Sequence, residues 1–186
     1  MASGRENVSW WSRVITLIVT VVVVAGLWLA TTAAYENIRI SRGTDQILSV
    51  IANARDMAIG GNFQAGDDLL QRLARAGRLT DINGANPSYV LNTWQMPITA
   101  KVLSANQARF ELTLPTPICR RLAAFFSKDA IALGIQEIEG RVSGSPWQKI
   151  HEIVDVKKLV EPSSATIYRG CGEEQQVMLA LVLQLR

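Results

Sequence analysis

The hydrophobic pattern begins with one long apolar stretch near the start of the chain. Residues 14–34 contain no charged side chain, and at about 1.5 Å of rise per residue a helix over them reaches roughly 30 Å, the thickness of a bilayer's hydrocarbon core. Many of these residues are β-branched, but a backbone surrounded by hydrocarbon must bond internally, which favours a helix. Trp10, Trp11 and Tyr35 flank the stretch, where aromatic side chains mark membrane interfaces. We therefore predict a transmembrane helix over 14–34.

A cleaved signal peptide is the alternative interpretation, because small residues occupy positions 30–34. However, the apolar run is longer than a signal peptide's apolar core of about 7 to 15 residues, and the helical pattern continues beyond it. Residues 1–13 are then a short cytoplasmic head or leader. Arginines on both flanks leave the orientation open under the positive-inside rule, so we place the large domain outside the cytoplasm because of its cysteines.

An amphipathic pattern continues the helix over 35–60. Apolar residues recur at helical spacing, so one side of this continuation needs a partner surface; they are Ile47, Ile51, Ala54 and Ala58. Gly43 is a position where the helix can bend, and Gly60-Gly61 is expected to end it.

The remaining residues, 61–186, show both strand and helix patterns. Period-two alternation around a short polar turn predicts an antiparallel hairpin over 98–103 and 109–114. Thr116 is expected to cap a following helix, with Pro117 at the first helical position. Further elements are predicted as a helix over 67–76, turns over 81–88 and 143–146, strands over 135–142, 165–168 and 177–185, and either state over 150–160. The fold class is therefore α+β, with a long N-terminal helix packed on an antiparallel sheet.

Composition and charge limit the number of domains, the class of binding partner and the state of the cysteines. The chain has 186 residues and a net charge of +3, which suits an anchor and one modest domain. Its basic residues are scattered singly, without the stripe that tracks phosphates, so no nucleic-acid partner is expected. Cys119 and Cys171 both follow the anchor. In an exported domain they predict one disulfide, with two free buried thiols as the alternative.

The sequence contains no motif for catalysis. The single histidine, His151, has no glycine-flanked nucleophile near it, and we expect it to be at the surface or half-buried. Asp67 and Asp68 are explained by favourable charge at a helix start. The cysteines lack the close spacing of a redox or zinc motif, and no phosphate-binding glycine loop occurs. We therefore expect no enzyme, no metal and no cofactor.

Several short stretches are shared with one known family. Asn92-Thr93-Trp94-Gln95-Met96 precedes a predicted strand, and the strand ending at Pro115 is followed by a helix with Cys119 and Leu122. Cys171 then precedes the apolar strand over 177–185. In this layout the chain resembles the type IV pilins, and within them the type IVb and conjugative thin-pilus class, which carry Asn-Pro-Trp-Gly-Gly at the first of these stretches.

The sequence departs from the family pattern at three places. Pilin precursors have a leader that ends in glycine, whereas Arg13 directly precedes Val14 here, and Val19 stands where the mature chain usually has a glutamate. Gln95 and Met96 also replace the two glycines of the motif. The resemblance is thus to a divergent pilin-like subunit.

The resemblance implies a pilin-like domain over 61–186, with a disulfide between Cys119 and Cys171 and with Asn92 and Trp94 as motif residues. It implies a bacterial inner-membrane subunit, exported and then assembled into an extracellular pilus for attachment or conjugation. The expected partners are the membrane, further copies or other pilin subunits, and the pilus assembly machinery. Trp147, inside the disulfide loop, is either a contact residue or core. The filament-core residues of the helix would be Val14, Ile15, Leu17, Ile18, Val21, Val22, Leu27 and Leu29.

Two other classes compete with this expectation. The first is a single-pass inner-membrane protein with a periplasmic adaptor or sensor domain, which the missing glutamate and leader favour. The second is a membrane-anchored hydrolase, which would require His151 to lie beside a serine in a cleft.

Overall fold

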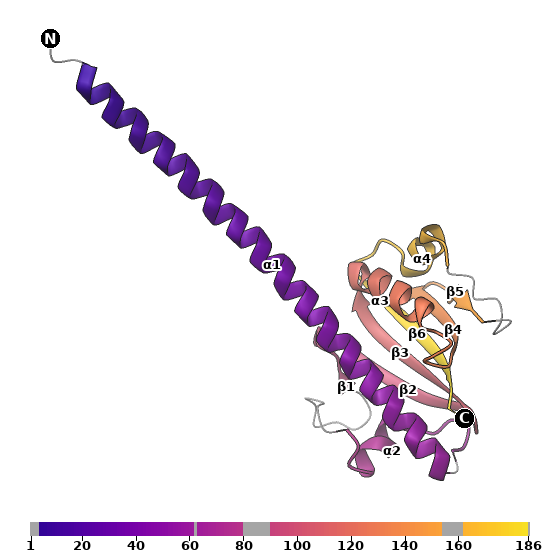
Figure 1. Ribbon diagram of the computed structural model, residues 1–186. Helices are drawn as coiled ribbons and strands as arrows, with labels where there is room; N and C mark the ends of the chain where they lie inside the picture. Colours follow the sequence, from indigo (N-terminus) through magenta and orange to yellow (C-terminus); the bar gives the residue numbers. More distant parts are fainter. Residues whose placement is uncertain (1–3, 62, 80–89, 154–161, 186) are drawn as a thin grey trace. The chain divides into compact units, whose positions relative to one another are not determined.

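The computed structural model describes residues 4–61, 63–79, 90–153 and 162–185. The chain divides into two compact units, Met1–Ser41 and Arg42–Arg186. The first unit consists of the N-terminal part of helix α1 (Gly4–Gly60), and the second contains the rest of that helix and all other described elements (Figure 1).

Helix α1 joins the predicted apolar and amphipathic stretches in one element, which continues through Gly43 and ends at Gly60 as the glycine pair predicted. In the first unit, Oγ1 of Thr16 and of Thr20 each donates to the carbonyl four residues earlier at 2.8 Å, so these hydroxyls are satisfied within the helix. In the second unit the apolar side of α1 is buried, as predicted, at Ile47, Ile51, Ala54 and Ala58, and Val50 is buried as well.

The described strands form one six-stranded antiparallel sheet in the order β1-β2-β3-β6-β4-β5. The predicted hairpin is confirmed as β2 and β3, and the predicted strand over 135–142 is confirmed as β4. The C-terminal strand β6 lies between β3 and β4, which explains its nearly continuous burial. The strands are β1 (Val90–Leu91), β2 (Pro97–Ser104), β3 (Gln107–Pro115), β4 (Ile135–Val142), β5 (Gln148–Glu152) and β6 (Gln176–Gln184).

Three short helices complete the second unit: α2 (Leu69–Arg75), α3 (Thr116–Lys128) and α4 (Ser164–Cys171). The predicted helix over 67–76 is confirmed as α2, where the Asp68 side chain caps the start by accepting from Gln71 N at 3.0 Å. Gly77 follows with a φ of 67°, the left-handed conformation that glycine adopts after a helix.

Two local predictions were wrong. Residues 165–168 lie in helix α4 and not in a strand, because Ser163 caps a helix there by accepting from Thr166 N at 3.2 Å. Thr116 is not the cap of α3: Pro115 holds that position without a side-chain hydrogen bond, so Pro117 is the second helical residue and not the first. The Thr116 hydroxyl donates to the Glu174 carbonyl instead. The turn predicted over 81–88 and most of the ambiguous segment 150–160 lie outside the described residues, although β5 covers the latter's first residues.

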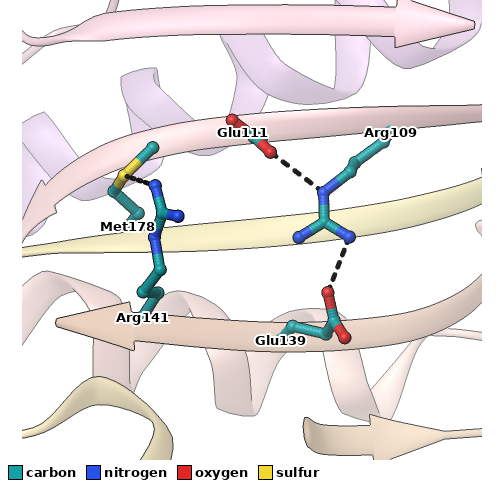
Figure 2. Close-up of polar contacts among 5 residues, drawn as sticks. All are labelled: Arg109, Glu111, Glu139, Arg141 and Met178. Carbon is teal, nitrogen blue, oxygen red and sulfur yellow. Dashed lines mark hydrogen bonds and ion pairs between the residues drawn. The ribbon is translucent and has the colours of Figure 1, made fainter. Parts of the chain in front are cut away.

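The sheet has one apolar face and one polar face. Along β3, buried apolar residues alternate with half-buried polar ones. The register sets Leu112 of β3 and Gly140 of β4 on either side of Leu179 of β6 on the apolar face. The helices drawn in Figure 2 lie behind the sheet, with charged side chains in front of it. The apolar core therefore lies between the sheet and the helices.

Residues 42–60 of α1 are held to the ends of the central strands by polar contacts. Arg55 donates from Nε to the Gln184 carbonyl at 3.3 Å and from Nη2 to the Leu133 carbonyl. Burial lowers the pKa of the Arg55 guanidinium. These bonds satisfy carbonyls at the end of β6 and just before β4, where the ladder stops.

Candidate functional site

Of the described helices, only α1 is long and apolar enough to cross a membrane, with a mean hydropathy of 2.5 in its most apolar window. None of that window is buried within the chain. Val14 is half-exposed, and the other seven residues predicted for a filament core are exposed by 55% to 69%: Ile15, Leu17, Ile18, Val21, Val22, Leu27 and Leu29. So large an unbroken apolar surface needs lipid or other helices as its surroundings, which supports membrane association.

Asn92 organises the turn between β1 and β2. Its side chain is buried, and its Oδ1 accepts from the backbone N–H groups of Trp94 at 2.9 Å and of Met96 at 3.0 Å. Its Nδ2 donates to the Thr113 carbonyl on β3 at 2.8 Å. One side chain thus fixes the turn and ties it to the end of the neighbouring strand.

Trp94 connects the same turn to α1. Gly43 of α1 is buried against the indole, and a Cβ placed on it would come within 2.4 Å of Cη2 of Trp94. Next to this contact, Gln46 Nε2 donates to the Leu91 carbonyl at 3.2 Å. The two predicted motif residues therefore have positioning roles: Asn92 shapes the turn, and Trp94 packs it onto the helix where the second unit begins.

A disulfide joins Cys119 of α3 to Cys171 of α4, with a Cα–Cα distance of 5.9 Å. Both cysteines are fully buried. Beside it, Arg120 Nη2 donates to the Gly172 carbonyl at 2.7 Å, and the guanidinium lies 3.7 Å from the Tyr168 ring centroid. The disulfide fixes α4 against α3, over the apolar face of the sheet.

A charged cluster that sequence reasoning missed crosses the polar face (Figure 2). Arg109 of β3 reaches over β6, pairing through Nη1 with Glu139 of β4 at 2.7 Å and through Nε with Glu111 at 3.0 Å. Ala180 of β6 pairs with both glutamates in the register and is fully buried beneath them. The small alanine leaves room for the arginine to cross. The alternation in β3 indicated an outward side for Arg109, but its partner on β4 depends on β6 lying between the two strands.

Trp147 covers this cluster. Its ring centroid lies 4.3 Å from Cζ of Arg109 and 4.5 Å from Cζ of Arg141, and it is half-buried. Arg141 Nη2 also contacts the sulfur of Met178 at 3.1 Å. Trp147 is therefore neither an apolar-core residue nor freely exposed: it shields the ion pairs from water and fastens the β4–β5 loop to the sheet.

His151 is buried, in contrast to the prediction of a surface or half-buried position. The β4–β5 register shifts by one residue between Ile138 and Glu139, and this bulge turns both Ile150 and His151 toward the helix-covered face. Its Nε2 has no hydrogen-bond partner among the described residues, so none of their serine hydroxyls bonds to that nitrogen. Those residues also contain no group of three or more His, Cys, Asp or Glu side chains arranged for a metal ion.

An open cleft of about 560 Å³ lies between the end of α1 and α2. Two of its arginines are paired with carboxylates, Arg72 with Asp67 at 2.8 Å and Arg78 with Asp56. His151 does not line it. Its lining residues are Asp56, Met57, Gly60, Gly61, Arg72, Arg75, Ala76 and Arg78.

The chain matches no protein-family model, no curated protein and no solved structure. Any assignment of function therefore depends on the chain's own residues and geometry.

Proposed function

We propose that this chain is a structural subunit, a major or minor pilin, of a type IVb-like pilus that serves attachment or conjugation. The observation that carries the proposal is helix α1. Its most apolar window has no buried residue, and its C-terminal part is built into a domain closed by a disulfide. Such a subunit is stored in the inner membrane and later exchanges lipid contacts for contacts with other helices in a filament core.

The turn at Asn92 supports the resemblance independently of the helix. Gln95 has a φ of 60°, and it is the only described non-glycine residue with a positive φ. It stands at the first glycine of the pilin motif, a position where glycine avoids the steric cost of this conformation. The backbone thus keeps a conformation suited to the family's glycine although the residue has changed.

A membrane-anchored adaptor or sensor domain is the second candidate. The observation in its favour is Val19, an apolar residue where pilins carry the glutamate thought to pair with a neighbouring subunit's N-terminal amine. A chain that never assembles has no use for that carboxylate.

The two candidates differ in where the chain is found. Cells expressing it should be sheared under conditions that produce pili, and the released material examined by electron microscopy and by intact mass with and without reductant. The pilin proposal expects filaments whose subunit gains two hydrogens on reduction, and the mass also shows whether residues 1–13 remain attached. A matched strain that lacks the chain controls for other filaments. Retention of all the protein in the membrane fraction would favour the adaptor.

A further inference from the structure

His151 lies on an edge strand of the sheet in a buried environment. Among the described strands, β5 pairs with β4 alone, through Glu137, Ile138, Glu139 and Gly140. The bulge places His151 opposite Ile138 on the helix-covered side, and its Nε2 lacks a partner among the described residues. Because an edge strand has one set of neighbours, it is the part of a sheet that opens most easily.

The charged side chains that the structure describes on β5 and β4 lie away from the imidazole. Lys149 on the same strand bonds Glu137 of β4 at 2.8 Å and Glu152 at 2.9 Å, and these three side chains belong to the opposite, polar face. On β4, Glu139 also lies on the polar face, where it pairs with Arg109. No carboxylate among them is placed to stabilise a charged imidazole.

The helix that packs on the other side of β5 is α4. It touches the strand through Gly170, whose backbone lies against the Ile150 side chain. The titratable and charged side chains of α4 are Tyr168 and Arg169, and both are exposed, with the Tyr168 ring held by Arg120. None of the described charged side chains of β4, β5 and α4 therefore faces the imidazole, and its burial lowers the pKa of His151.

We propose that His151 is an acid-sensitive latch that holds edge strand β5 on the sheet when neutral and releases it when protonated. A charged imidazole needs water, and opening of β5 supplies it. Opening also separates Ile150 from Gly170 and leaves the edge of β4 unpaired. This latch is independent of whether the chain assembles into a filament.

The sign of the pH dependence follows from the lowered pKa. The open state binds the proton more readily than the closed state, so the closed state loses stability as the pH falls below about 6.5. The loss continues until the pH reaches the pKa of the closed state. Above pH 6.5 the histidine is neutral in both states, so protonation no longer weakens the closed state. Carboxylates titrate near pH 4, so the range between pH 5.0 and 7.5 isolates the histidine.

The test uses the full chain in detergent micelles, made without a histidine tag. Because the chain has a single histidine, its imidazole NMR signals need no assignment by mutation, and their titration gives the pKa. Hydrogen exchange, corrected for the intrinsic rate at each pH, reports the opening of residues 148–152. We expect an imidazole pKa below 6.5 and a loss of protection of up to about tenfold per pH unit in β5, with protection in β3 and β6 unchanged.

Two variants separate the latch from other effects. His151→Phe removes the titrating group at similar volume and should make β5 protection independent of pH. Lys149→Gln removes the ion pairs on the opposite face of the same strand and should keep the pH dependence. An imidazole pKa of 6.5 or higher would overturn the proposal. Three other results would also overturn it. The protection of β5 would not change with pH, its pH dependence would persist in His151→Phe, or β6 would lose protection together with β5.

Discussion

The indole of Trp94 lies directly against the backbone of Gly43, so closely that a Cβ on Gly43 would come within 2.4 Å of Cη2. The contact joins a turn of the sheet to the long helix at the start of the second unit. It therefore ties the turn resembling the pilin motif to the element that would enter a filament. The same geometry makes several features of the molecule testable.

Gly43→Ala should destabilise the second unit by about 1 to 3 kcal/mol, because the added methyl must displace the indole. Gly60→Ala is the matched control, since a Cβ there meets nothing within 4 Å, and alanine suits a helix better than glycine by up to about 1 kcal/mol. Denaturant unfolding in detergent, followed by tryptophan fluorescence, measures both. Equal effects of the two substitutions would contradict the close contact.

Gln95→Gly should stabilise the protein by about 0.5 to 1 kcal/mol. Relief of the left-handed conformation, worth about 1 to 2 kcal/mol, exceeds the entropy that glycine adds to the unfolded chain. Met96→Gly, one residue later and without a positive φ, should instead lose up to about 1 kcal/mol. If Gln95→Gly destabilised the protein as Met96→Gly does, the positive φ of Gln95 would not be a source of strain.

Removing the disulfide through the double substitution Cys119→Ala and Cys171→Ala should cost about 2 to 5 kcal/mol of unfolding free energy. Because both cysteines are fully buried, a mild reductant should not react with the native wild-type chain until it unfolds. Thiol labelling followed by intact mass, at increasing denaturant, checks this order. Reduction of the folded protein within minutes would show that the bond is accessible.

Arg109→Met should destabilise the protein by about 2 kcal/mol, because Glu139, only 16% exposed, would lose its cation. Lys149→Met removes the two ion pairs of an exposed lysine on the same face and should change stability by less than about 1 kcal/mol. Thermal unfolding of the two variants in one buffer compares them. Similar losses would mean that the crossing over Ala180 contributes no more than an ordinary surface ion pair.

Local sequence patterns were sufficient to predict the long helix, α2, the β2–β3 hairpin, β4 and β6. They were not sufficient for α4, because Thr166, Ile167 and Tyr168 favour a strand locally, whereas the Ser163 cap and the bond to α3 hold them in a helix. Asn92 and Trp94 were selected by resemblance alone, and their hydrogen bonds and packing became visible only in the fold.

The sequence by itself determined where the chain is apolar enough to enter a membrane and which side of residues 47–58 of α1 is buried, because hydrophobic periodicity is a local property. The tertiary structure decided the rest. Arg109 meets Glu139 only because β6, the last strand, inserts between β3 and β4. His151 is buried only because the β4–β5 pairing slips by one residue. Strand order and register join residues far apart in the chain, and no local pattern encodes them.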